Sequence, residues 1–237
     1  MNQQTDKAIL VVSFGTSYEA SRKATIEKIE QDIRNAFQDH RIYRAWTSKF
    51  IISILKKRDN YMVPTVKEAL EQMITDGIRE VVVQPTHILD GIENNIMKEE
   101  VLSYKESFDK IAFGTPLLAD SKDESQAINA VTTEFSDLKE TEALVFMGHG
   151  TEHYANTVYA ALDYRFKDTG HKNIFLGTVE AYPALDSLLR AADSFHPKKI
   201  VLAPFMIVAG DHAQNDLAGA DPDSWMNRLS SEGYEVT

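Results

Sequence analysis

Short apolar runs alternate with segments of helical periodicity along most of this chain, and this alternation limits its fold more than any other feature. The run from Ala8 to Val12 is apolar throughout, as expected for a strand that is covered on both faces. Farther on, Ile26, Ile29 and Ile33 recur at spacings of three and four, which indicates one face of a helix. Strands that alternate with helices favour parallel pairing through helical crossovers. The sequence therefore predicts an α/β fold with parallel sheets.

The same patterns place the other elements. Strands are predicted over residues 8–12, 41–46, 80–84, 110–113, 143–147, 174–179 and 199–203. Helices are predicted over residues 17–37, 64–76, 93–104, 155–166 and 221–229, and from residue 183 onward. Pro64, Pro183 and Pro222 are each expected in a first helical turn, where the missing N–H is tolerated. Residues 233–237 resemble the start of one more strand, either at a sheet edge or at a truncated end.

The two halves of the chain look like copies of one unit. An apolar run that ends in Gly-Thr occurs at residues 9–16 and again at residues 143–151. A proline that follows a predicted strand and precedes a glycine by six residues also occurs in each half. We therefore expect a duplicated scaffold, with an N-terminal lobe at residues 1–118 and a C-terminal lobe at residues 119–237.

This duplication sets a register between the two lobes. Matching the Gly-Thr ends and the two prolines places Phe14 opposite His149, and Glu93 opposite His212. The lobes therefore share a scaffold, but only the second has histidines at these positions. A chemical site built on these histidines would belong to the second lobe.

Composition excludes several classes of function. The formal net charge is −11, and we expect no nucleic-acid partner because phosphate binding requires clustered cations. The chain has no cysteine, which excludes disulfides, thiolate nucleophiles and thiolate metal ligands. Any metal must then be held by histidines and carboxylates, which suit borderline divalent cations. The first apolar stretch is too short for a signal or a membrane span, so we expect a cytoplasmic protein without a membrane partner.

Three strong metal ligands or bases follow predicted strands of the second lobe. His149 lies between two glycines, Glu180 ends its strand, and His212 lies in a Gly-Asp-His segment. Because the carboxyl ends of parallel strands share one edge of a sheet, these side chains can meet there. Two imidazoles and one carboxylate form a metal set that leaves open positions. We therefore predict that these three residues form a metal site and the catalytic group.

Each of these residues also has an ordinary structural interpretation. His149 could cap the following helix, His212 could be a surface-loop residue, and Glu180 could be a helix N-terminal charge. His153, four residues after His149, is the alternative ligand, and we interpret it as pocket lining. Asp216 could orient His212, because metal-binding histidines usually need such a partner.

The first lobe offers weaker signals. His87 follows a predicted strand and could line the same cleft or be a satisfied structural histidine. Residues 13–17 form a turn at a helix start, whose backbone N–H groups could hold a carboxylate or phosphate. The sequence contains neither a Gly-x-Ser-x-Gly elbow nor a P-loop. The histidine and carboxylate set is therefore the best catalytic pattern in the chain.

Six segments together resemble the anaerobic cobalt chelatases, which are the sirohydrochlorin cobaltochelatases of the class II chelatase family, over essentially the whole chain. These segments are residues 13–17, 44–48, 84–88, 147–151, 179–183 and 209–216. The resemblance implies two flavodoxin-like lobes that face each other across a cleft. It also implies insertion of Co²⁺ into sirohydrochlorin, or its precursor precorrin-2, in anaerobic cobalamin biosynthesis. The reaction would need neither ATP nor an organic cofactor.

The resemblance also implies roles for single residues. His149 and His212 would be metal ligands and acceptors of pyrrole protons, since an imidazole can do both, and Glu180 would be the third ligand. We expect the macrocycle to contact six further residues, namely Ser13, Phe14, Thr16, His87, Glu93 and His153. Because sirohydrochlorin carries many carboxylates and the chain is acidic, Arg44 and Lys49 are candidate counter-charges.

Other functions stay open at this point. Histidine and glutamate ligands accept several divalent ions, so a ferrochelatase or nickel chelatase acting on a related tetrapyrrole is a close alternative. A carrier that binds a metal or tetrapyrrole without turnover is an alternative of another class. The sequence also leaves open whether the protein forms a homo-oligomer.

Overall fold

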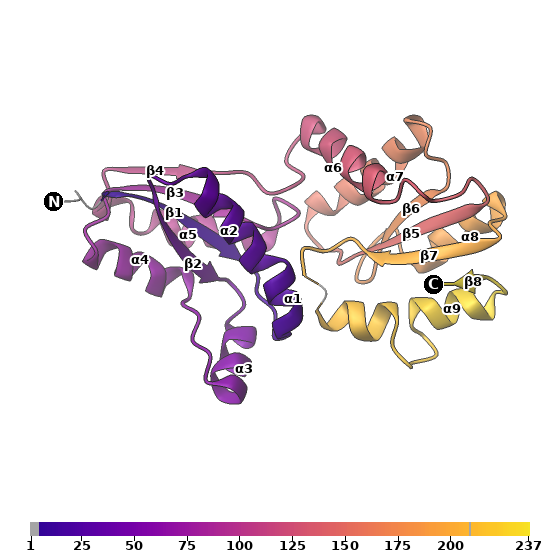
Figure 1. Ribbon diagram of the computed structural model, residues 1–237, viewed down its shortest axis with the longest axis horizontal. Helices are drawn as coiled ribbons and strands as arrows, with labels where there is room; N and C mark the ends of the chain where they lie inside the picture. The colour runs from indigo at the N-terminus through magenta and orange to yellow at the C-terminus, as the bar shows by residue number, and fades with distance from the viewer. Residues whose placement is uncertain (1–4, 209) are drawn as a thin grey trace. The chain divides into compact units, whose positions relative to one another are not determined.

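The computed structural model of the protein describes residues 5–208 and 210–237. It divides into two compact units, Met1–Leu117 and Leu118–Thr237, whereas the sequence predicts the boundary after residue 118. Each unit contains a four-stranded parallel sheet with helices around it (Figure 1). The predicted α/β class with parallel sheets is therefore confirmed.

The sheet of the first unit has the strand order β2-β1-β3-β4. Its strands are β1 (Lys7–Ser13), β2 (Arg41–Trp46), β3 (Glu80–Pro85) and β4 (Lys110–Phe113). Its helices are α1 (Glu19–Ala24), α2 (Ile26–Ala36), α3 (Lys49–Asp59), α4 (Val66–Thr75) and α5 (Ile92–Leu102), followed by a 3₁₀ turn at Lys105–Ser107. The bounds of β2 and β4 are those predicted from the sequence.

The sheet of the second unit has the order β6-β5-β7-β8, which repeats the first unit strand for strand. Its strands are β5 (Glu142–Gly148), β6 (Ile174–Thr178), β7 (Lys199–Pro204) and β8 (Glu235–Val236). Its helices are α6 (Ser121–Glu134), α7 (Thr157–Asp168), α8 (Leu185–Phe195) and α9 (Trp225–Ser231), with a 3₁₀ turn at Tyr154–Asn156 and a π-helical turn at Ala213–Leu217. This repetition confirms the predicted duplication.

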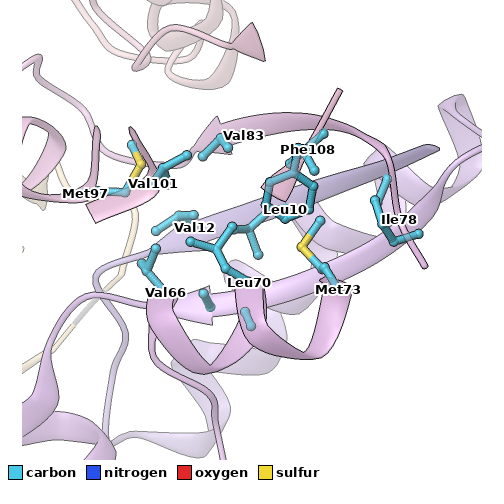
Figure 2. Close-up of a cluster of buried hydrophobic side chains, with 14 residues drawn as sticks. Leu10, Val12, Val66, Leu70, Met73, Ile78, Val83, Met97, Val101 and Phe108 are labelled. Carbon is cyan, nitrogen blue, oxygen red and sulfur yellow. The ribbon is translucent and has the colours of Figure 1, made fainter. Parts of the chain in front are cut away.

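The core of the first unit is a cluster of side chains from β1, β3, α4 and α5 (Figure 2). Leu10, Val12, Leu70 and Met97 are at most 1% exposed. Burial of an apolar side chain of this size stabilises a fold by about 1.5–3 kcal/mol. The second unit has a matching cluster, which includes Ala143, Val145, Met147, Phe175, Leu188 and Ile200. Each central strand is therefore held rigidly up to its carboxyl end.

The strand register of the two units agrees with the predicted match between them. Ser13 pairs with Trp46 in the first sheet, and Gly148 pairs with Thr178 in the second. The residues that directly follow these pairs are therefore equivalent. Phe14 matches His149, as the sequence predicts.

An inserted helix distinguishes the first unit from the second. Trp46 N donates to Pro64 O at 3.0 Å, and Thr178 N donates to Pro183 O at 2.6 Å, so these two bonds are equivalent. The first unit accommodates α3 between its bonded residues, whereas the second has only residues 179–182 there. Figure 1 shows α3 extending away from the sheet of its unit.

Two helices are absent from the sequence prediction. The α3 segment contains the nearly continuous apolar run from Phe50 to Leu55, which shows no single helical stripe. The α6 segment begins beside Asp120, whose side chain caps it by accepting from Lys122 N and Asp123 N. Its polar first turn favours an interpretation as a connection between the lobes.

The prediction of one helix over residues 17–37 is wrong, because α1 and α2 meet at Thr25. The Thr25 hydroxyl donates to Ser21 O at 2.8 Å, and such a bond to the preceding turn bends helices. Periodicity could not reveal this break, since the apolar stripe from Ile26 onward lies entirely on one side of it.

The three helix-starting prolines lie before their helices and not in the first turns. Thr65 caps α4 through reciprocal bonds with Glu68, and Ser224 caps α9 by accepting from Asn227 N. Ala184 precedes α8 without a side-chain cap bond. An N-cap position therefore lies between each proline and its helix, so the predicted starts are too early.

No helix in residues 5–208 and 210–237 combines the length and the apolar character that a membrane crossing requires. The predicted cleft between the lobes stays a prediction.

Candidate metal centre

His149, Glu180 and His212 lie close together in the second unit. One possible ligand atom from each of the three residues lies within 4.8 Å of the others. Glu180 Oε2 is 3.5 Å from His149 Nδ1, and Glu180 Oε1 is 3.5 Å from His212 Nε2. The two imidazole rings meet edge to face, with centroids 4.6 Å apart. No second group of this kind occurs in the part of the chain that the structure describes.

The positions of His149 and Glu180 follow from the sheet. His149 directly follows β5, Glu180 lies two residues after the end of the paired strand β6, and Glu180 N donates to His149 O at 3.0 Å. Gly150 then turns the chain with φ +87°, a conformation that favours glycine. A Cβ atom at Gly150 would lie 2.9 Å from Ala181 N. The two ligand-bearing loops therefore pack backbone against backbone.

Hydrogen bonds orient both imidazoles. His149 Nδ1 lies 2.8 Å from Gly150 O, and His212 Nδ1 lies 2.6 Å from Asp216 Oδ2. A carbonyl or carboxylate oxygen can only accept, so each Nδ1 is the donor in its bond, and Nε2 is the ring nitrogen left to bind a metal. The predicted orienting contact of Asp216 is therefore present. Partners of this kind normally set the tautomer of histidines that bind metals.

The three side chains are also accessible. His149 and Glu180 are 48% and 51% exposed, and His212 is 30% exposed. A metal ion could therefore reach all three without rearrangement of the core. The arrangement provides two imidazole nitrogens and one carboxylate as possible ligands, with open positions for a second set of ligands.

His153 does not join this group. Its Nδ1 accepts from Ala155 N at 3.2 Å, and its ring stacks against Tyr154 with centroids 4.1 Å apart. His153 thus caps the 3₁₀ turn that precedes α7. His153 is therefore close to His149 along the chain but is not part of the group of possible ligands. Its predicted contact with a macrocycle stays a prediction.

The candidate residues after β1 differ in their exposure. Ser13 and Thr16 are 2% exposed, whereas Phe14 is 43% exposed. Ser13 Oγ accepts from the Thr86 hydroxyl at 2.8 Å, and Thr16 Oγ1 accepts from Tyr18 N at 3.3 Å. Only Phe14 therefore offers its side chain at the surface.

Glu93 lines a pocket of about 360 Å³ within the first unit, at the carboxyl end of β2. Trp46, Thr47, Lys49 and Thr65 also line it. Lys49 is thus a cation at a hollow, in agreement with its candidate role as a counter-charge.

Arg44 is engaged elsewhere in the first unit. It donates to Glu30 Oε1 at 2.6 Å and to the Tyr61 hydroxyl at 2.7 Å. The structure thus places Arg44 in a structural network with α2, which makes it a poor candidate for binding substrate carboxylates.

His87 follows β3 and is half-buried, with both of its ring nitrogens shielded from solvent. Neither of its ring nitrogens has a hydrogen-bond partner within the described ranges. Burial lowers the pKa of His87 to about 4, so its imidazole is neutral near physiological pH. Its predicted contact with a macrocycle stays a prediction.

Sequence reasoning missed one residue beside the metal centre, Asn156. Its side-chain amide contacts the loops of both His149 and Glu180. Its bond to Tyr182 O spans 26 residues of the chain, so no local pattern in a single sequence indicates this bridge.

The whole chain is similar to known proteins. The profile of the family described as Cobalt chelatase (CbiK) matches residues 7–237. The chain is 37% identical over 231 residues to the sirohydrochlorin cobaltochelatase of Salmonella typhimurium, with 98% of this chain and 87% of that protein covered. It is 31% identical over 236 residues to the sirohydrochlorin cobaltochelatase CbiKC of Nitratidesulfovibrio vulgaris, with 97% and 81% covered.

A solved structure supports the fold. SirB from Bacillus subtilis with Fe³⁺ superposes with a TM-score of 0.62 at 12% identity, over 98% of this chain and 87% of that chain. This likeness concerns the fold alone. The family profile and the two relatives confirm the resemblance seen in the sequence, and the chain therefore belongs to the cobalt chelatase (CbiK) family.

Proposed function

We propose that this protein inserts Co²⁺ into sirohydrochlorin, or its precursor precorrin-2, in anaerobic cobalamin biosynthesis. Membership of the cobalt chelatase family supports the reaction type, and the names of both relatives support cobalt and sirohydrochlorin. The observation that carries the proposal is the convergence of His149, Glu180 and His212 at one sheet edge. Ligands of these types accept several divalent ions, so the preference for cobalt rests on the family.

In this proposal the incoming Co²⁺ binds through Nε2 of both histidines and one oxygen of Glu180. The partners Gly150 O and Asp216 keep each Nδ1 protonated and each Nε2 free to bind. The Glu180 carboxylate offsets part of the metal charge. Three protein ligands leave coordination positions at which pyrrole nitrogens can begin to replace them.

Chelation then exchanges two pyrrole protons for one divalent metal. As Co²⁺ moves to the macrocycle nitrogens, its bonds to the two Nε2 atoms break, and these nitrogens become free to take up the departing protons. The exchange of N–H bonds for N–Co bonds uses no nucleotide, in keeping with an ATP-independent reaction. The same imidazoles thus serve as metal ligands and proton acceptors in succession.

Insertion of Co²⁺ into sirohydrochlorin, followed by visible absorption, tests the proposal. We expect His149→Ala and His212→Ala each to reduce the insertion rate strongly, because each removes a metal ligand and a proton acceptor. His171→Ala is the matched control, since His171 precedes β6 at the amino end of the same sheet. Wild-type rates in both site variants would overturn these roles.

A single-turnover form of this assay separates a chelatase from a carrier. With stoichiometric protein, Co²⁺ and macrocycle, a chelatase yields the spectrum of the metallated product. A carrier would leave the spectrum of the free macrocycle unchanged, and that result would contradict the proposal.

A further inference from the structure

One side-chain amide joins the two loops that hold His149 and Glu180. Asn156 Oδ1 accepts from Thr151 N at 3.1 Å, and Asn156 Nδ2 donates to Tyr182 O at 2.6 Å. Thr151 lies two residues after His149, and Tyr182 lies two residues after Glu180. Asn156 therefore bridges the two loops at equal distances along the chain from the two ligands.

Asn156 is itself held on a rigid element. It ends the 3₁₀ turn at Tyr154–Asn156, and Asn156 N donates to His153 O at 2.9 Å. Helix α7 begins at the next residue and packs tightly on the end of β5, since a Cβ atom at Gly148 would lie 2.6 Å from Tyr159 Cε1. A side-chain amide that is fixed on a rigid element can hold the loops it contacts in position, because the amide itself has little conformational freedom.

The opposite ends of the two loops are already joined by main-chain contacts. Glu180 N donates to His149 O, and Gly150 packs against Ala181. Asn156 joins the same two loops a second time, at Thr151 and Tyr182. The loops of His149 and Glu180 are thus fixed to each other. His212 instead lies after β7, and its orienting partner, Asp216, belongs to the π-helical turn that directly follows it.

The first unit lacks this bridge although it has the same turn. Tyr18 N donates to Thr16 Oγ1 at 3.3 Å, as His153 N donates to Thr151 Oγ1 at 3.2 Å. By this match Ser21 stands where the second unit has Asn156. Within the described part of the chain, the Ser21 hydroxyl has no hydrogen-bond partner. The amide bridge therefore accompanies the metal ligands and is not required by the shared scaffold.

We propose that Asn156 is a positioning residue that holds His149 and Glu180 at the separation needed to bind the metal together. This inference rests on the proposed function, since it assigns Asn156 a role in the same metal centre. The amide suits the task because it supplies one acceptor and one donor, as the Thr151 N–H and the Tyr182 carbonyl require. Asn156 acts through the two ligand loops and does not bind the metal itself.

Calorimetric titration of the full chain with Co²⁺ alone tests the proposal. We expect Asn156→Ala to weaken Co²⁺ binding about tenfold, the effect typical of removing a partner that orients metal ligands. Asn156→Asp keeps the acceptor but loses the donor, so its affinity should fall between those of the wild type and Asn156→Ala. Unchanged Co²⁺ affinity in Asn156→Ala would overturn the inference.

Asn173→Ala is the matched control. Asn173 also carries an amide, and its Nδ2 donates to Glu142 O at 3.0 Å, at the amino end of the same sheet. We expect this variant to bind Co²⁺ as the wild type does. If both asparagine variants weakened binding equally, the effect would be a general loss of structure and the inference would fail.

A double-mutant cycle separates positioning from general destabilisation. If Asn156 acts by placing Glu180 against His149, Asn156→Ala should have little further effect on Co²⁺ affinity once Glu180 is replaced by alanine. In an Asp216→Ala background, which alters the His212 half, the effect of Asn156→Ala should persist in full. Equal effects in both backgrounds would overturn the inference.

The same titration with His149→Ala separates the proposed metal centre from the proposed role of Asn156. Wild-type Co²⁺ affinity in His149→Ala would overturn the proposed metal centre itself. Lost binding in His149→Ala together with wild-type binding in Asn156→Ala would overturn only the role of Asn156.

Discussion

The two units share one backbone plan but end their equivalent strands in different chemistry. In the second unit, Glu180 N donates to His149 O at 3.0 Å, and in the first, Ser48 N donates to Phe14 O at 3.2 Å. The main-chain bond is therefore preserved, while a histidine and a carboxylate in one unit correspond to an aromatic ring and a helix cap in the other. The scaffold determines where a site can form, and the side chains at the strand ends determine whether it can hold a metal.

The comparison also explains why the three candidate ligands come from one unit. A carboxylate and two imidazoles must approach closely, and three strand ends of a single sheet achieve this without any contribution from elsewhere. The first unit is left with an exposed Phe14 and a pocket lined by Glu93 and Lys49. Contact of Phe14 and Glu93 with the macrocycle, which the sequence predicts, stays a prediction.

The largest effect on Co²⁺ binding is expected when His149 of the second unit is replaced by phenylalanine, the residue at the equivalent position of the first unit. His149→Phe introduces the residue found at the equivalent position and removes both a ligand and a base. We expect Co²⁺ affinity and insertion rate to fall by more than about 100-fold, beyond the loss typical of a mere orienting partner. Calorimetry and the absorption assay measure the two quantities.

The converse substitution is the control for this experiment. Phe14→His should create no Co²⁺ site in the first unit, because Ser48 stands where Glu180 supplies the carboxylate. A metal site gained by Phe14→His would mean that the histidine alone, and not the set of three, distinguishes the units.

The next effect concerns His87, whose counterpart two residues after the matching proline is Met206. Burial lowers the pKa of His87 from 6.5 to about 4. Between pH 6.5 and about pH 4, this histidine therefore binds a proton in the unfolded chain but not in the folded chain. The folded state should therefore lose up to about 3 kcal/mol of stability as the pH falls from about 6.5 to about 4.

His87→Met should remove this part of the pH dependence. Urea unfolding at about pH 7.5 and about pH 4.5 measures it as the change in the free energy of unfolding between the two conditions. The variant should lose less stability on acidification than the wild type. An equal loss in both proteins would show that His87 is not kept neutral in the folded state.

A smaller effect is expected from the partner of the second histidine. Asp216→Ala removes the carboxylate that holds His212 Nδ1 at 2.6 Å, and we expect Co²⁺ binding to weaken about tenfold. Asp216→Asn retains an acceptor and should lose less affinity. Asp168→Ala, at the end of α7, serves as the control and should bind Co²⁺ normally.

The smallest effect concerns Ser48, the counterpart of Glu180 in the first unit. Its side chain accepts from Ile51 N and caps α3, so Ser48→Ala should reduce the free energy of unfolding by about 1 kcal/mol. Co²⁺ affinity should not change. A loss of Co²⁺ binding in this variant would contradict the view that equivalent positions have separate tasks in the two units.

Much of the fold follows from local sequence patterns. The central strands β1 and β5 are buried along nearly their whole length, and their continuous apolar runs are the strongest local signal. The partly buried edge strands β2 and β4 are also predicted with the bounds that the structure has. The grouping of His149, Glu180 and His212 also follows from topology, since strand ends of a parallel sheet converge. Their metal-binding role stays a prediction until it is measured.

Other features depend on contacts that local patterns do not record. The break at Thr25 rests on one side-chain hydrogen bond, and the start of α4 rests on the capping pair of Thr65 and Glu68. The bridge made by Asn156 joins residues 26 positions apart. Such interactions are set by packing in three dimensions, whereas periodicity reports only which face of an element is buried.

The insertion of α3 has a consequence for how this architecture can change. The bond between Trp46 N and Pro64 O joins the chain at the base of the inserted segment, and the corresponding bond is made in the unit that has no such helix. The entropy of closing a loop rises only slowly with its length, so segments of very different size can be accommodated there. This position is therefore a natural grafting point, at which an accessory module could be added, shortened or exchanged during evolution or engineering while the sheet below it is left intact.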